Sequence, residues 1–164
     1  MLHLAITGHR KLNSAPAVSK QIDEALLQLA NEHQPPWLIY SSLAEGADRL
    51  VVERIFARFP AQLIVPLPLQ VEEYSKDFSG ATSVIEFNLW LNLGHQVVHL
   101  PSSDRPYAYL CAGLYMLEHC SHLLAVWDGL PARGVGGTGQ IVAEASRRSI
   151  PVSWVKIPAG QSHG

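Results

Sequence analysis

The chain has 164 residues, of which 48% are hydrophobic and 16% are charged, and its net charge is -2. This length predicts one domain with a single core, and the composition excludes intrinsic disorder. The low charge predicts no nucleic-acid partner, and no apolar stretch approaches the ~20 residues that cross a membrane.

The first strand is predicted at residues 2–7 (LHLAIT) and ends at Gly8, which is followed by His9 and Arg10. In open parallel sheets, ligands bind at the edge formed by the carboxyl ends of the strands. Arg10 offers a planar set of N–H donors that suits phosphate or carboxylate. A solvated loop arginine is the alternative, and this segment alone does not decide between the two.

An amphipathic helix at residues 17–31 and a strand at 37–42 come next, followed by the segment LAEGADRL, which opens another helix. The polar and glycine residues of this segment are Glu45, Gly46, Asp48 and Arg49. Asp48 either complements the helix N-terminus or, with Glu45 and Arg49, accepts ribose hydroxyls or binds phosphate beside the first loop.

The middle of the chain continues the alternation of strands and helices. After a third strand at residues 62–68, the polar segment 70–83 is expected to be a loop or short helix over the sheet edge. The elements that follow are a helix at 83–94, a strand at 96–101 and a helix at 106–120. Gly113 lowers the helix propensity of the last of these, so close packing or ligand approach is its expected reason.

A fifth strand at residues 122–127 leads into a turn with four glycines in six residues. Such a turn allows positive φ angles and close approach of a ligand, and the N–H groups of the helix behind it favour an anion such as phosphate. A flexible surface loop is the alternative. The candidate residues of this turn are Asp128, Gly136, Gly137, Thr138 and Gly139.

With a final strand at residues 152–157, this order predicts an α/β fold. We expect a Rossmann-like three-layer α/β/α domain over residues 1–157, with a mainly parallel sheet of about six strands. Residues 158–164 are expected to form a disordered tail.

Cysteine and histidine usage bears on location and metals. Cys111 and Cys120 lie nine residues apart without CxxC spacing, which predicts reduced thiols. Because a strand begins almost at once, we expect no signal peptide and a cytoplasmic location. The histidine pairs straddle predicted helix–strand junctions, so no metal site is expected, and His9 is the histidine placed at the ligand edge.

Three segments, ITGHR, SSLAEGADRL and AVWDGLPARGVGGTG, together resemble the SLOG superfamily of Rossmann-like proteins. That group includes the cytokinin-activating LOG proteins, DprA-like DNA-processing proteins and molybdenum cofactor carriers. The resemblance covers nearly the whole chain and is strongest to small bacterial members. It implies a pocket for a nucleotide or nucleotide-derived ligand, with the GGTG turn near phosphate, and it is compatible with a homo-oligomer. The residues to which it assigns ligand binding are Gly8, His9, Arg10, Glu45, Gly46, Asp48, Arg49, Asp128, Gly136, Gly137 and Thr138.

The chain departs from the LOG enzymes, which cleave ribose-5′-phosphate from a nucleotide and resemble PGGxGTxxE. Here the run is GVGGTGQIVAEA, so the glutamate position falls on Ala143 or Ile141, depending on whether GG or Thr is aligned. Glu144 is out of register in both alignments. Arg147 and Arg148 lie three and four residues after it, which predicts a surface ion pair.

Three hypotheses follow. The first is binding or sensing of a nucleotide-type ligand, without an assigned catalytic residue or other cofactor. The second is hydrolysis of an N-glycosidic bond in a nucleotide, with Asp48, Asp128 or Glu45 in acid/base roles. The third is a carrier of a phosphorylated cofactor such as molybdopterin.

Overall fold

The computed structural model describes residues 1–13, 15–101, 104–132 and 134–159. Most of the predicted tail, residues 160–164, therefore lies outside the described residues. Among the described residues, no helix combines the length and apolarity needed to cross a bilayer.

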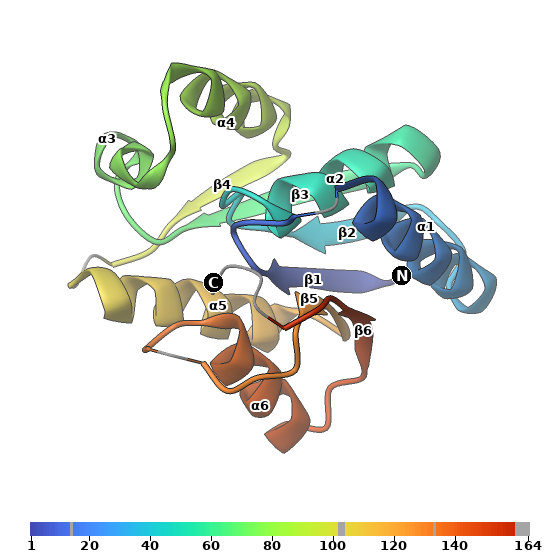
Figure 1. Cartoon of the computed structure of the whole chain (residues 1–164). Helices are drawn as coiled ribbons and strands as arrows, with labels where there is room; N and C mark the ends of the chain where they lie inside the picture. The colour runs from blue at the N-terminus through green and yellow to red at the C-terminus, as the bar shows by residue number, and fades with distance from the viewer. Residues whose placement is uncertain (14, 102–103, 133, 160–164) are drawn as a thin grey trace.

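Strands and helices alternate as the sequence predicts (Figure 1). In chain order the elements are β1 (His3–Gly8), α1 (Ala15–Glu32), β2 (Trp37–Tyr40), α2 (Ala47–Arg58), β3 (Ala61–Leu67), α3 (Val71–Tyr74), the 3₁₀ turn η1 (Ser75–Asp77), α4 (Ala81–Leu93), β4 (Gln96–His99), α5 (Arg105–His119), β5 (His122–Trp127), α6 (Thr138–Arg147) and β6 (Val152–Lys156).

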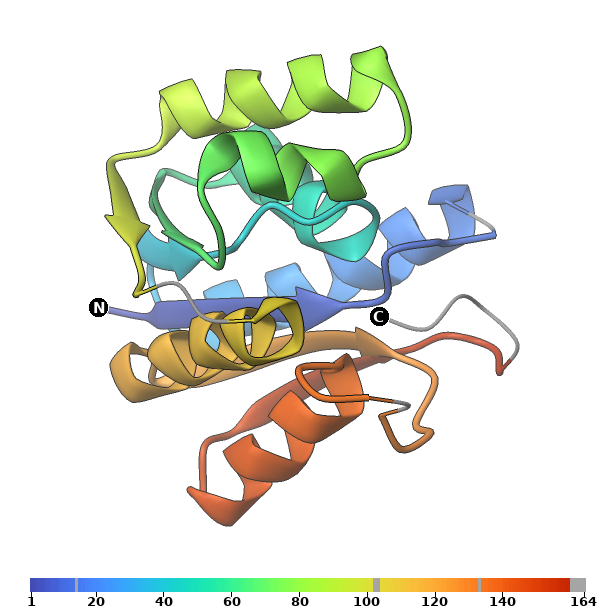
Figure 2. The ribbon, with the colours of Figure 1, turned by 90° about the vertical axis from the view of Figure 1, so that its left-hand side faces the viewer.

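The six strands form one parallel sheet in the order β4-β3-β2-β1-β5-β6. The chain builds outward from β1 to β4 and then returns to the other side of β1 to add β5 and β6. Because right-handed crossovers put the connecting helix on opposite faces for the two directions, α1, α2 and α4 cover one face and α5 and α6 the other (Figure 2). The predicted Rossmann-like three-layer fold is confirmed, with a sheet that is parallel throughout.

The alternating side chains of β1 fill two apolar layers. Leu4 and Ile6 pack into the larger cluster with α1 and α2, whereas Ala5 packs into the smaller cluster with α5 and α6. The order of strands reverses between β1 and β5, which is where open α/β sheets leave a crevice for ligands.

One helix keeps an exposed apolar stripe. Ile85, Leu89 and Leu93 lie one turn apart on α4 and are exposed, while Phe87 is buried in the larger cluster. The sequence leaves open whether this helix is covered by its own sheet, and the structure shows that only one side of it is.

Candidate functional site

The loops that follow β1, β2 and β5 are held together by their backbones. The His9 N–H donates to the Val126 carbonyl oxygen at 3.1 Å, and the Ala47 N–H donates to the His9 carbonyl oxygen at 3.0 Å. A side chain at Gly8 would overlap the Cβ of Ala47. Gly8 therefore lets the end of β1 meet the start of α2, which brings the predicted loops to one place.

Gly46 has a similar packing role. Its φ is 81°, a left-handed conformation that favours glycine, and a side chain there would overlap the carbonyl group of Arg10. The loop before α2 thus lies directly against the GHR segment.

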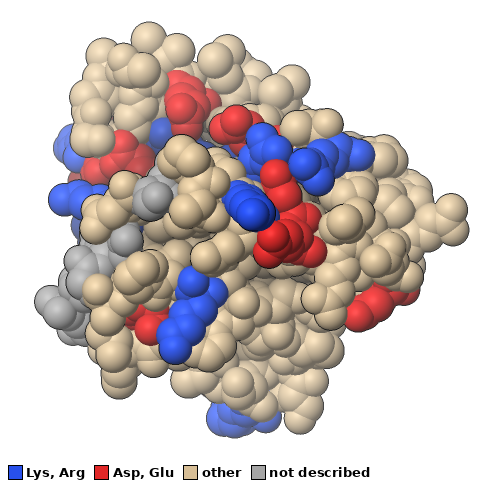
Figure 3. All heavy atoms as spheres, turned by 45° about the vertical axis from the view of Figure 1, so that its right-hand side comes forward, with Lys and Arg blue, Asp and Glu red and all other residues tan. Residues whose placement is uncertain are grey.

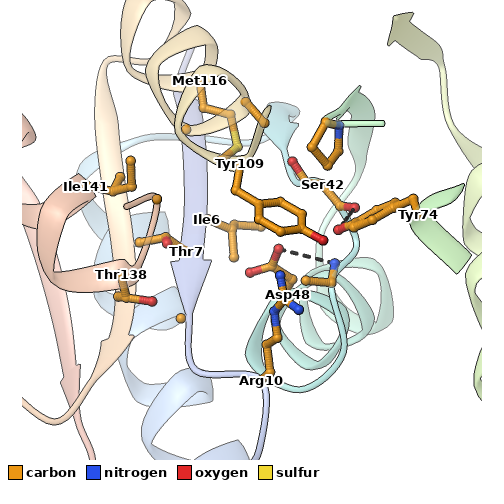
Figure 4. A pocket seen from close by; sticks show the side chains of 16 residues that line it. Ile6, Thr7, Arg10, Ser42, Asp48, Tyr74, Tyr109, Met116, Thr138 and Ile141 are labelled. Carbon is orange, nitrogen blue, oxygen red and sulfur yellow. Dashed lines mark hydrogen bonds between the residues drawn. The ribbon is translucent and has the colours of Figure 1, made fainter. Parts of the chain in front are cut away.

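A pocket with a volume of about 70 Å³ opens at this edge, at the reversal point between β1 and β5 (Figure 4). Five residues predicted from the sequence line it: Gly8, Arg10, Asp48, Gly136 and Thr138. The remaining lining residues are Ile6, Thr7, Ser42, Ala44, Pro68, Tyr74, Tyr109, Ala112, Gly113, Met116 and Ile141.

The α5 helix supplies one wall that the sequence analysis did not assign. Tyr109, Ala112, Gly113 and Met116 are spaced as one helix face and all line the pocket. The only signal noted in the sequence was Gly113, and the structure explains it by close packing, because a side chain there would overlap Ile141 of α6. Tyr109, an aromatic residue one turn before Gly113, was the sequence signal that could have extended the predicted site to α5.

Arg10 lies at the mouth of the pocket. Its guanidinium carbon is 4.8 Å from the centre of the Tyr109 ring, a cation–π contact. Its Nη1 lies 3.9 Å from Oδ2 of Asp77, and the side chain is 36% exposed. Arg10 is thus held by a ring face and one long ion pair, which leaves guanidinium donors available to an anion.

Asp48 is the charged side chain deepest in the pocket. It lies in the first turn of α2, is 7% exposed and accepts a hydrogen bond of 3.3 Å from the Ala44 N–H. Burial raises the pKa of its carboxyl to about 7, against the lowering effects of the Ala44 N–H and of the charges on Arg10 and Arg49. At neutral pH this carboxyl is poised between donating and accepting a hydrogen bond.

Two other predicted residues of the same loop turn away from the pocket. Arg49 donates from Nε to the Leu43 carbonyl oxygen at 2.9 Å and from Nη1 to the Ser83 carbonyl oxygen at 3.0 Å. The Glu45 carboxylate accepts from the Ser79 N–H at 2.9 Å and from the Ser83 hydroxyl. Both side chains join this loop to the start of α4, and neither lines the pocket.

His9 and Asp128 form a buried pair beside the pocket. Nε2 of His9 lies 3.3 Å from Oδ1 of Asp128, and the same Oδ1 accepts from the Leu130 N–H at 3.0 Å. The pair connects the ends of β1 and β5 without lining the pocket. Among the described residues, His, Cys, Asp and Glu do not gather in threes suited to a metal ion.

The glycine-rich turn is used mainly for packing. Gly136 has a φ of 85° and lies against the start of α5, and its N–H donates to Oε1 of Gln140 at 2.6 Å. Gly137 is the N-cap of α6. Gly139 packs against the backbone at Ala132 and lines an outer groove instead of the pocket.

Thr138, the first residue of α6, is buried and lines the pocket, so the N-terminal turn of this helix meets the ligand edge. Farther along the helix, Glu144 accepts hydrogen bonds of 2.9 Å from Nε of Arg147 and from Nε of Arg148. These bonds lower the pKa of the Glu144 carboxyl to about 2. The predicted surface ion pair of Glu144 is thus confirmed.

No family model and no curated protein matches the sequence. Solved structures share its fold, including the following two. The X-ray structure of TM1055, a structural genomics target, is 13% identical with a TM-score of 0.58 and covers 93% of this chain and 72% of its own. DNA processing protein A from Helicobacter pylori, described with a single-stranded DNA binding mode, is 15% identical with a TM-score of 0.59 and covers 98% of this chain and 68% of its own.

The second of these structures corrects one expectation. The net charge predicted no nucleic-acid partner, yet a protein of this fold binds single-stranded DNA, so that exclusion is wrong. Net charge averages over the whole surface, whereas nucleic acid is bound by local groups. On the face shown in Figure 3, Lys and Arg side chains lie beside Asp and Glu side chains, an arrangement that a sum of charges does not describe.

At these identities the likeness establishes the fold alone. The predicted resemblance is confirmed at that level by the parallel sheet, its reversal point and the two structural neighbours. The chain has a Rossmann-like three-layer α/β fold, which both of these structures share.

Proposed function

We propose that this protein binds a small phosphorylated ligand of nucleotide type in the pocket between β1, α2, α5 and α6. The observation that carries the proposal is the meeting, in one pocket, of Arg10, the first turn of α6 at Thr138 and the buried carboxyl of Asp48. An arginine fork and a helix N-terminus both favour phosphate. The buried carboxyl adds a polar group for an uncharged part of the ligand.

The size of the pocket limits which part of a nucleotide enters it. Its volume of about 70 Å³ is roughly half that of an engineered cavity of about 150 Å³ that binds benzene. A phosphate or sugar group therefore suits this volume better than a purine or pyrimidine ring. The base would lie at the mouth, where Arg10 covers the Tyr109 ring.

Calorimetric titration with nucleoside mono-, di- and triphosphates, ADP-ribose and a short single-stranded oligodeoxynucleotide tests this function. We expect at least one phosphorylated ligand to bind, and Arg10→Ala to weaken it by about tenfold through loss of a charge-assisted hydrogen bond. The oligodeoxynucleotide is included because a structural neighbour is described as binding single-stranded DNA.

Arg58→Ala is the matched control. Arg58 is the last residue of α2, and Asp48 lies in the first turn of that helix. The Nη2 of Arg58 lies 3.3 Å from Oδ2 of Asp23, so Arg58→Ala makes the same change in net charge at the far end of α2. We expect unchanged affinity. Equal weakening by both variants would indicate a non-specific charge effect, and no binding to any of these ligands would refute the proposal.

A second function is favoured by one observation. Of the three carboxylates considered for acid/base chemistry, only Asp48 lines the pocket, and its pKa of about 7 suits proton transfer near neutral pH. Hydrolysis of the N-glycosidic bond would release free base from nucleoside monophosphates, and Asp48→Asn would abolish the release.

A carrier of a phosphorylated cofactor such as molybdopterin would instead retain a pterin on purification, detectable by mass spectrometry.

A further inference from the structure

The Tyr109 hydroxyl is buried and has no hydrogen-bond partner among the described residues. Buried hydroxyls are almost always paired, because leaving one without a partner costs free energy. Figure 4 shows this hydroxyl directed toward Tyr74, on the side of the pocket where Asp48 lies and away from Met116. The unsatisfied group therefore faces the polar end of the pocket.

Two further polar side chains, Tyr74 of α3 and Asp48 of α2, line the same end of the pocket. The Tyr74 ring of α3 lies 6.2 Å from the Tyr109 ring, and its hydroxyl donates to the Ser42 carbonyl oxygen at 3.0 Å. Burial, and then the nearby Asp48 carboxylate, raise the pKa of the Tyr74 hydroxyl, so it stays protonated. The polar end thus combines one carboxyl and two phenol groups.

This end lies apart from the first turn of α6. In Figure 4, Thr7 and Thr138 lie on one side of Ile6, Asp48, Ser42 and Tyr74 lie on the other, and Arg10 lies beside Asp48 at the mouth. A phosphate held at the first turn of α6 therefore leaves the Asp48 end to another part of the same ligand.

The chemistry of that part follows from the groups that face it. A phenol can donate to it and a carboxylate can accept from it, so a group that both accepts and donates is satisfied by the pair. A hydroxyl does both and fits a volume of about 70 Å³ more readily than a base ring.

We propose that Asp48 and Tyr109 form a subsite for a sugar hydroxyl of the phosphorylated ligand, so that the site prefers ribonucleotides to their deoxy forms. This subsite rests on the proposed function, since it presumes a ligand whose phosphate lies at α6. It makes Asp48 and Tyr109 specificity-determining residues.

Titration with adenosine and uridine 5′-monophosphates, each in ribo, 2′-deoxy and 3′-deoxy form, tests the subsite. We expect the unaltered protein to bind the ribo form about tenfold more tightly than one deoxy form, the effect of one hydrogen-bonded hydroxyl. Tyr109→Phe and Asp48→Asn should each reduce this ratio to below about threefold while retaining affinity for the deoxy form. Tyr107→Phe is the matched control, because Tyr107 is 56% exposed on the same helix and does not line the pocket.

Equal affinity of the unaltered protein for all three forms, or a ratio that both variants leave unchanged, overturns the subsite and leaves the proposed function standing. If neither the nucleotides nor the wider phosphorylated panel binds, both fail together. Thermal unfolding of each variant identifies one that does not fold. The ratio of ribo to deoxy affinity measured on the unaltered protein then decides whether the subsite exists.

Discussion

Gly113 of α5 packs directly against Ile141 of α6, so that a single methyl group added at Gly113 would overlap the Cδ1 atom of Ile141. Both residues also line the pocket. We expect Gly113→Ala to destabilise the protein by about 1–3 kcal/mol, because overpacking outweighs the gain in helix propensity. Denaturant unfolding measures the change.

A second substitution separates overpacking from other effects at this contact. Ile141→Val removes the Cδ1 atom, so Gly113→Ala combined with Ile141→Val should be more stable than Gly113→Ala alone. If the double variant is no more stable, the overlap with Ile141 is not the cause.

The Asp48 carboxyl makes folding stability depend on pH. Its pKa is about 7 in the folded protein and 3.8 ordinarily, so the folded state binds this proton more tightly than the unfolded state. The stability that Asp48 contributes is fully present below pH 3.8 and is lost as pH rises through 7. The difference between these two pKa values corresponds to at most about 4 kcal/mol of unfolding free energy.

Asp48→Asn removes this titration. Thermal unfolding should show that the variant gains stability relative to the unaltered protein between pH 5 and pH 8. A constant difference across that range would mean that Asp48 does not titrate there.

Gly46 and Gly80 separate backbone strain from steric overlap. Both have positive φ, 81° and 92°, but a side chain at Gly46 would overlap the Arg10 carbonyl group, whereas one at Gly80 would meet nothing within 4 Å. Gly80→Ala should therefore cost about 1–3 kcal/mol of strain. Gly46→Ala should cost clearly more, because the GHR loop must also move. Similar losses of unfolding free energy in the two variants would contradict the close approach of the loops.

Local patterns were enough to predict the fold. The regularly spaced apolar residues of α1 lie on its buried side; they are Val18, Ile22, Leu26 and Leu29. The apolar run 122–127 forms β5. Hydrophobic periodicity and glycine or proline breaks depend on neighbours in the chain, so they can be read without knowing the contacts.

The candidate site was predicted only in part. Arg10, Asp48 and Thr138 line the pocket, but Glu45 and Arg49 of the same polar loop bond to Ser79 and Ser83 near α4. Residues next to one another on a loop or helix point in different directions, and composition does not state which one faces a neighbouring element.

The sequence by itself determined the α/β alternation, the glycine turns and the loops that lie at the carboxyl edge of the sheet. Only the tertiary structure decided that α5 forms a pocket wall and that Tyr109 and Asp48 line the same pocket. The physical reason is the reversal of strand order between β1 and β5: the crossover from β4 carries α5 to the opposite face of the sheet and over the reversal point. That placement depends on the pairing of strands far apart in the chain, which no local pattern encodes.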